Sequence, residues 1–121
     1  MTQPRTTIAA LVRGKPVELP VDQVAYFKAD CKYTAAHHPG GTLLLRDPIK
    51  TLAEELGEAF IHIHKATLVA RSQVLEIVRM PLTKDCYIVL KGRKEQLKIS
   101  RGRYRQVCQA LSIRPAINRR R

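Results

Sequence analysis

The sequence predicts a mainly β domain with two short helices, and three observations support this fold class. Short runs of apolar and β-branched residues recur along the chain, separated by turn signals that contain Gly and Pro. At Asp47-Pro48 the apolar spacing changes from that of strands to that of a helix, and a second helical pattern begins at Arg101. We therefore expect small antiparallel sheets, one amphipathic helix near 48–56 and a C-terminal helix near 101–111.

The part of the chain before Asp47 reads as a succession of short strands. The first apolar run stops at Gly14-Lys15-Pro16, a turn that would bring the chain back as a second strand. The aromatic pair Tyr26 and Phe27 indicates a buried strand, and Pro39-Gly40-Gly41 separates the next two. The strands predicted in this part span residues 6–13, 17–19, 24–30, 33–38 and 42–46.

A helix follows, with recognisable signals at both of its ends. Asp47 is suited to the N-cap, because its carboxylate can accept hydrogen bonds from the amides of the first turn. Pro48 suits the first helical position, and Gly57 suits the C-terminal end. Four apolar residues recur at three- and four-residue spacing, namely Ile49, Leu52, Ala53 and Leu56. The outer face is acidic, with Glu54, Glu55 and Glu58, so it is poorly suited to meet an anionic partner.

The second half returns to strands and ends in the second helix. We expect residues 67–72 to link two of these strands and Lys91-Gly92-Arg93 to make a tight hairpin turn. The final ten residues show no periodicity and end in three arginines, which predicts a basic flexible tail at 112–121. The domain proper would be 1–111, with a core over about 7–111. The predicted strands span 60–64, 74–80, 86–90 and 95–99.

Charge narrows the class of partner. The chain of 121 residues is long enough for one compact domain. It carries 22 Lys and Arg against 10 Asp and Glu, a formal net charge of +12, with a sequence pI near 10.2. Such an excess causes self-repulsion and is typical of proteins with an anionic partner. A solvated basic surface without a partner is the alternative explanation.

The cysteines and the apolar runs bear on location. Cys31, Cys86 and Cys108 are odd in number and lack metal-ligand spacing, which fits reduced thiols in the cytoplasm. No apolar run has the length of a membrane-spanning helix, and the first ten residues lack a signal-peptide pattern. We expect a cytoplasmic protein that does not engage a membrane.

Two stretches project cations from this β-rich framework. The first, FIHIHKATLVA at residues 60–70, interleaves apolar residues with His62, His64 and Lys65. The second, KISRGRYRQV at residues 98–107, leaves a strand and places three arginines within five positions, Arg101, Arg103 and Arg105. Cations held in fixed directions by a folded framework are what binding to a phosphate backbone requires. The pattern favours a DNA-binding module.

The order of these segments resembles a known family. ELPVDQVAYFKADCKYT, LLLRDPIKTLAEELGEAFIHIHKATLVA and LKGRKEQLKISRGRYRQVCQAL resemble, in this order, the opening, middle and end of the LytTR-type DNA-binding domain. The similarity is greatest to the output domain of AlgR-like bacterial response regulators, and it covers about residues 7–111. It implies an elongated fold of small antiparallel sheets whose loops enter successive grooves of double-stranded DNA, without a helix-turn-helix.

The resemblance also implies which residues meet DNA and which partners to expect. Three places correspond to the family's contacts, namely Lys32, Tyr33 and Thr34; His64 and Lys65; and Arg101, Arg103 and Arg105. Two positions depart from the pattern: Lys65 stands where Arg or Asn is common, and Gly102 stands where a basic residue is common. The implied function is transcription regulation in a two-component system, on promoter direct repeats and with a possible homodimer on DNA. We expect no cofactor and no receiver domain.

Other readings of the same residues remain open. RNA binding by a basic β module is the nearest alternative, although the aromatic content of 5% and the lack of an RNP-like strand disfavour it. The four histidines, His37, His38, His62 and His64, raise the possibility of a metal site, but no metal-binding framework surrounds them. Ser100 lacks the sequence context of a nucleophile, so we expect it to cap the last helix and expect no enzymatic activity.

Overall fold

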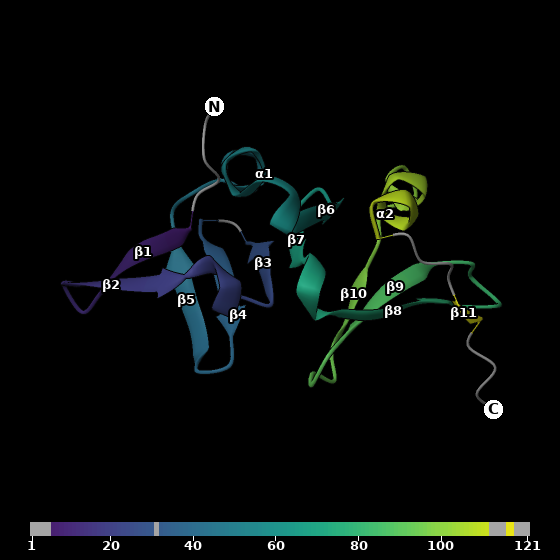
Figure 1. The fold of residues 1–121 in the computed structure, drawn as a ribbon, viewed down its shortest axis with the longest axis horizontal. Helices are drawn as coiled ribbons and strands as arrows, with labels where there is room; N and C mark the ends of the chain where they lie inside the picture. Colours follow the sequence, from purple (N-terminus) through teal and green to yellow (C-terminus); the bar gives the residue numbers. More distant parts are fainter. Residues whose placement is uncertain (1–5, 31, 112–115, 118–121) are drawn as a thin grey trace.

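The computed structural model describes residues 6–30, 32–111 and 116–117. These residues form three sheets and two helices that follow one another along the long axis of the molecule (Figure 1). The strands are β1 (Thr7–Val12), β2 (Lys15–Pro20), β3 (Tyr26–Ala29), β4 (Thr34–His38), β5 (Gly41–Leu45), β6 (Phe60–His64), β7 (Thr67–Ala70), β8 (Val74–Arg79), β9 (Cys86–Leu90), β10 (Gln96–Lys98) and β11 (Ala116–Ile117). The helices are α1 (Ile49–Leu56) and α2 (Tyr104–Leu111), with 3₁₀ turns η1 (Val21–Gln23), η2 (Gly57–Ala59) and η3 (Arg71–Gln73).

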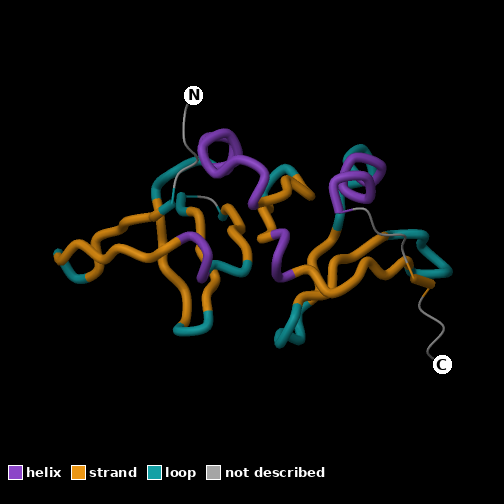
Figure 2. Tube along the Cα trace, in the orientation of Figure 1, coloured by secondary structure: helices purple, strands orange, loops and turns teal. Residues whose placement is uncertain are grey.

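The sheets are small and almost wholly antiparallel. A five-stranded sheet of order β5-β4-β3-β7-β6 lies between the β1–β2 hairpin and a sheet of order β10-β9-β8-β11 (Figure 2). Within the described residues only the pair β8–β11 is parallel. The predicted fold class, mainly β with two short helices, is confirmed.

The five-stranded sheet is covered by apolar side chains on both faces. Because successive side chains of a strand point to opposite faces, neighbours on β3 enter different cores. Phe27 packs with α1 and β1, whereas Tyr26 packs with β8–β10 and α2. Burial on both faces fixes the register of the central strands, since a slip of one residue would exchange the two faces.

The N-terminal end of α1 differs by one residue from the sequence prediction, whereas its C-terminal end agrees with it. Pro48 is the N-cap, with extended backbone (φ −66°, ψ 149°), so helical geometry begins at Ile49. The prediction of Asp47 as N-cap and Pro48 as first helical residue is therefore wrong by one position. At the C-terminal end Gly57 has φ +66°, a conformation that favours glycine, and the predicted stop is confirmed.

Residues 67–70 form a strand that the sequence analysis assigned to a linker. β7 is buried along its whole length and lies between β3 and β6. A strand that is buried on both faces has no polar alternation, so the period-two signal is absent from Thr67 to Ala70. The missed strand is the one that joins the two halves of the central sheet.

The C-terminal region begins later than predicted. α2 starts at Tyr104, and residues 101–103 form a turn in which the Arg103 amide donates to the carbonyl oxygen of Ser100 at 3.0 Å. Ser100 is thus too far from the helix to be its N-cap, and that prediction is wrong. In the predicted tail the structure describes only Ala116–Ile117, which pair with Val78 and Arg79. Arg119, Arg120 and Arg121 lie outside the described residues, and tail flexibility stays a prediction.

Candidate nucleic-acid interface

Hydrogen bonds between distant segments bring the three predicted contact regions to one end of the central sheet. The chain turns from β3 to β4 beside the β6–β7 turn, where the Ala29 amide donates to the Ala66 carbonyl at 2.8 Å. The segment before α2 joins the same end, because the Ser100 amide donates to the Ile63 carbonyl at 2.8 Å. We call this region the cationic end; its predicted contact residues are Lys32, Tyr33, His64, Lys65, Arg101, Arg103 and Arg105.

The picture of the fold agrees with these bonds. Figure 1 shows α1, the β6–β7 turn and α2 along the upper edge of the molecule, with the β4–β5 and β9–β10 turns along the lower edge. Regions separated by more than thirty residues in sequence therefore share one edge.

The first region contributes two residues rather than three. Lys32 is exposed, and the Tyr33 side chain is 43% exposed. Thr34 is only 3% exposed, and its hydroxyl donates to the Asp47 carbonyl at 2.6 Å. Because β4 places Thr34 inward, its side chain is not available to DNA in this structure. We correct its assignment from DNA contact to a structural tie between β4 and the start of α1.

The second region is a hairpin turn that its two histidines hold in shape. The Ala66 amide donates to Nδ1 of His64 at 3.3 Å, and Nε2 of His62 lies 3.4 Å from the Lys65 carbonyl oxygen. An irregularity in the β6–β7 register falls between the two histidines. Lys65 is exposed at the tip of this turn, while His64 is half-buried. His64 thus supports the turn, and Lys65 is the group presented to a partner.

The third region presents three arginines in different environments. The Arg101 side chain is 79% exposed and donates from Nη2 to Oδ1 of Asp85 at 3.2 Å. Arg103 is half-buried and Arg105 is exposed on the first turn of α2. Val107 is 1% exposed and anchors that helix, which packs against β6. The main chain that carries the arginines is therefore fixed relative to the β6–β7 turn.

The second and third regions also affect each other electrostatically. Burial lowers the pKa of His62 from its ordinary value, and the charge of Arg103 lowers it further. The His62 imidazole is therefore neutral at pH 7 and adds no positive charge to this end.

The structure adds cations that sequence reasoning missed. Arg46 is exposed directly after β5, whose last residue pairs with Thr34 at the cationic end. Arg79 and Lys84 line a pocket of about 320 Å³ together with Arg101. The pairing of Cys86 with Arg79, and the bond from the Ile99 amide to the Cys86 carbonyl, create this neighbourhood. No local sequence signal indicates such a long-range pairing.

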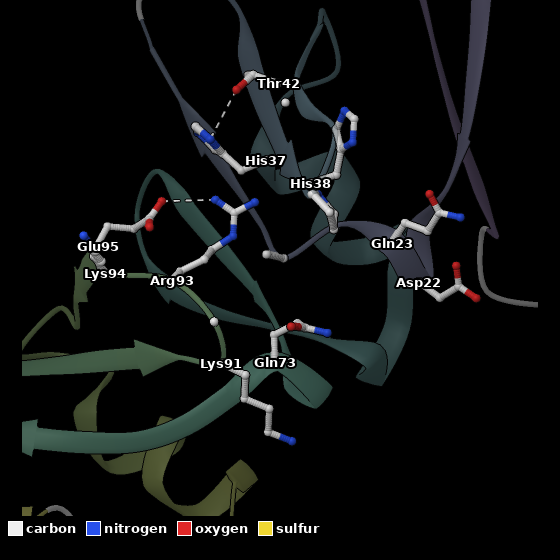
Figure 3. Close-up of a pocket in the computed structure, with 14 residues that line it drawn as sticks. Asp22, Gln23, His37, His38, Thr42, Gln73, Lys91, Arg93, Lys94 and Glu95 are labelled. Carbon is white, nitrogen blue, oxygen red and sulfur yellow. Dashed lines mark hydrogen bonds and ion pairs between the residues drawn. The ribbon is translucent and has the colours of Figure 1, made fainter.

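A cleft of about 890 Å³ lies at the opposite end of the sheet, between the β4–β5 and β9–β10 turns (Figure 3). Arg93 points into it toward His37, and Lys91 projects away from the histidines. The polar groups here bind one another: Arg93 Nη1 lies 3.2 Å from Glu95 Oε2, which accepts from the Tyr26 hydroxyl at 3.0 Å. The Tyr26 and His37 rings stack at 4.3 Å. These contacts join the central sheet to the β9–β10 turn.

Two further observations concern other classes of site. No group of three or more His, Cys, Asp and Glu side chains is placed to hold a metal ion within residues 6–30, 32–111 and 116–117. In the same part of the chain, neither helix has the length and apolar character needed to cross a membrane. Cys86 and Cys108 are free thiols, whereas Cys31 lies outside the described residues.

The family comparison decides the class. The family model described as LytTr DNA-binding domain matches residues 14–112, which is most of the chain. The chain belongs to the LytTr DNA-binding domain family. The family is one of DNA-binding domains of transcription regulators, so DNA is the partner class of this domain.

A curated relative and a solved structure agree with this membership. The LytTr domain described here is 44% identical over 80 residues to the positive alginate biosynthesis regulatory protein of Pseudomonas aeruginosa, covering 65% of this chain and 32% of that protein. The chain thus spans about a third of the length of that relative. It also superposes, with a TM-score of 0.79 and 14% identity, on the LytTr DNA-binding domain of a methyl-accepting/DNA response regulator from Bacillus cereus, covering 90% and 99% of the two chains. The superposition shows that this chain and the Bacillus cereus domain share one fold.

Proposed function

We propose that this LytTr domain binds double-stranded DNA sequence-specifically as a bacterial transcription regulator, through loops of the cationic end that enter successive grooves. The observation that supports this most is the gathering of Lys65 and the Arg101–Arg105 segment beside Lys32 and Tyr33 by main-chain bonds. Framework-held cations at one edge bind the backbone, and side chains between them read bases.

The residues differ in the chemistry they offer. Lys65, at the tip of a turn, acts as a point charge toward a phosphate. Arg101 and Arg103 carry planar guanidinium groups that can donate two hydrogen bonds to the O6 and N7 atoms of a guanine. We propose that Lys32 and Lys65 set position along the backbone while Arg101 and Arg103 read bases. Tyr33 would pack against sugar or base edges.

The regulatory setting rests on the relatives. The name of the Pseudomonas aeruginosa relative is that of a positive regulator of a biosynthesis, and that of the Bacillus cereus structure is a response regulator. These names support an output domain of a two-component regulator, acting in the cytoplasm where its DNA lies. We propose binding to direct repeats, with two copies of the chain on one promoter.

A selection of bound duplexes from a random-sequence pool tests this function. It should return a motif, and the spacing of two motif copies would give the arrangement of the repeats. Five phosphate contacts would give a slope of log affinity against log salt of about −4.5, which is roughly a 500-fold loss between about 50 and about 200 mM salt. Competition with RNA of the same sequence separates the RNA-binding alternative. No enriched motif, or affinity independent of salt, would refute the proposal.

A further inference from the structure

The exposed guanidinium of Arg101, which follows β10, is held by a carboxylate from the β8–β9 turn of the same sheet. Asp85, in the β8–β9 turn, accepts from Arg101 Nη2 at 3.2 Å on Oδ1, and its Oδ2 lies 3.7 Å from Nζ of Lys98. The Asp85 side chain is 14% exposed against 79% for Arg101. The largely buried carboxylate of Asp85 thus accepts a hydrogen bond from the end of the largely exposed Arg101 side chain.

The turn that carries Asp85 is itself well fixed. The Asp85 amide donates to Thr83 Oγ1 at 3.3 Å, and the Met80 amide donates to the Asp85 carbonyl at 2.8 Å. Burial alone would raise the pKa of Asp85, but the hydrogen bond and charge of Arg101 and the charge of Lys98 outweigh it and lower the pKa. Asp85 is therefore ionised at neutral pH and available as a rigid acceptor.

A carboxylate at a DNA-facing edge has two opposing effects. Its negative charge repels phosphate, which weakens binding to every sequence alike. Its hydrogen bond restricts a long side chain that would otherwise lose rotamer freedom on binding, which favours the one sequence that the restrained guanidinium fits. Because Arg101 uses one Nη for Asp85 and has five donor hydrogens, donors remain for a base edge.

We propose that Asp85 is a positioning residue that determines base specificity by orienting Arg101. The inference rests on the proposed function, since it assigns a role within the same DNA contact. Asp85 itself does not touch DNA; it lowers affinity for all sequences slightly and raises the preference for the correct one.

The test measures binding of the 121-residue chain to two duplexes of equal length, the motif recovered by selection and a scrambled version of it. The readout is the specificity ratio, the affinity for the motif divided by that for the scrambled duplex. Asp85→Ala should lower the ratio about tenfold, as expected for loss of one oriented base contact. Affinity for the scrambled duplex should stay equal or rise up to about threefold, because a negative charge is removed. Asp22→Asn, which removes an exposed carboxylate at the opposite end, is the control and should leave the ratio unchanged.

A double variant distinguishes a positioning role of Asp85 from a general effect of the substitution on folding. In Arg101→Ala, whose own ratio should fall about ten- to a hundredfold, adding Asp85→Ala should change the ratio by less than about twofold. Asp85→Leu, which keeps the branching of the side chain at Cγ but has no acceptor, provides the same comparison if Asp85→Ala melts early. Lys98→Ala should weaken both duplexes equally.

Each outcome is informative. An unchanged ratio in Asp85→Ala or in Asp85→Leu, or an equal loss with and without Arg101, would overturn the inference while leaving DNA binding intact. A loss of ratio in Lys98→Ala as large as in Asp85→Ala would show that Asp85 acts through Lys98 instead. If the unaltered chain itself showed no preference for the motif, the proposed function would fail first.

Discussion

Replacing Thr34 with Val tests the reassignment of this residue from DNA contact to structural support. Val has nearly the same volume but no hydroxyl, so the substitution removes the 2.6 Å bond to the Asp47 carbonyl and little else. At 3% exposure water cannot replace that bond. Removing one partner of a buried hydrogen bond costs about 1–2 kcal/mol, which for a domain of this size lowers Tm by roughly 4–8 °C.

The assay combines thermal melting with DNA binding. Thr34→Val should melt earlier but bind the selected duplex within about twofold of the unaltered chain, measured well below either Tm. Thr42→Val is a matched control, because Thr42 is exposed and its hydroxyl lies 3.5 Å from His37 Nδ1, so its stability should change by less than about 0.5 kcal/mol. A Tm unchanged in Thr34→Val together with affinity reduced tenfold would show that the hydroxyl contacts DNA and that the structural reasoning is wrong.

Three further predictions follow from the same geometry. Arg103→Ala should cost about 1–3 kcal/mol in binding and relax the preference at one base position, whereas deletion of residues 119–121 should weaken all sequences alike; selection with both variants checks this, and the reverse pattern would contradict it. Lys65→Glu should reduce DNA affinity by several kcal/mol without changing Tm, and Lys65→Arg should retain binding; circular dichroism that shows Lys65→Glu to be unfolded would make Lys65 a structural residue. Burial lowers the pKa values of His37 and His62; the charge of Arg93 lowers that of His37 further, and the charge of Arg103 lowers that of His62 further. As the pH falls below about 6.5, both histidines therefore take up protons in the unfolded chain before they do so in the folded chain. The free energy of unfolding, which is at its full value above that pH, should decline by at most about 1.4 kcal/mol per pH unit for each histidine. Urea unfolding at about pH 7.5 and about pH 5.5, with His37→Gln and His62→Gln as comparisons, measures this decline; stability that rises toward low pH would contradict it.

Local chemistry explains why much of the fold is visible in the sequence. The two hairpin turns β1–β2 and β4–β5 contain Gly, and Gly14 adopts the positive φ (+78°) that favours glycine at such a turn. The stripe of α1 repeats at helical spacing, and Ile49, Leu52 and Leu56 are buried as that stripe predicts. These signals depend on near neighbours in the chain, so periodicity and turn chemistry are sufficient to read them.

What the sequence conceals depends on distant partners. β7 lacks the polar alternation of a half-exposed strand, because the two hydrophobic cores cover both of its faces, with Leu68 in one core and Val69 in the other. Thr34 carries no mark that distinguishes a buried hydroxyl from an exposed one. The bond between Arg101 and Asp85 joins two segments sixteen residues apart that only sheet pairing brings together.

The sequence predicts the individual residues of the candidate site, but it does not predict that their segments lie together in the fold. The exposed positions of Lys32, Lys65 and Arg101 agree with the sequence prediction, whereas their roles on DNA stay predictions. That the segments carrying them meet at one end follows from the bonds Ala29–Ala66 and Ser100–Ile63, which the sequence does not indicate.

Amide chemical-shift changes in the 121-residue chain, on addition of the selected duplex, test most directly that the cationic end is the DNA-binding surface. The largest changes should cluster at Lys32 and Tyr33, at Lys65 and Ala66, and over residues 101–105. The amides of Gly40 and Gly92, in the turns at the opposite end of the sheet, should remain in place, since Figure 1 puts those turns on the other edge of the molecule. Changes concentrated at Gly40 and Gly92, with the cationic end unaffected, would contradict the assignment.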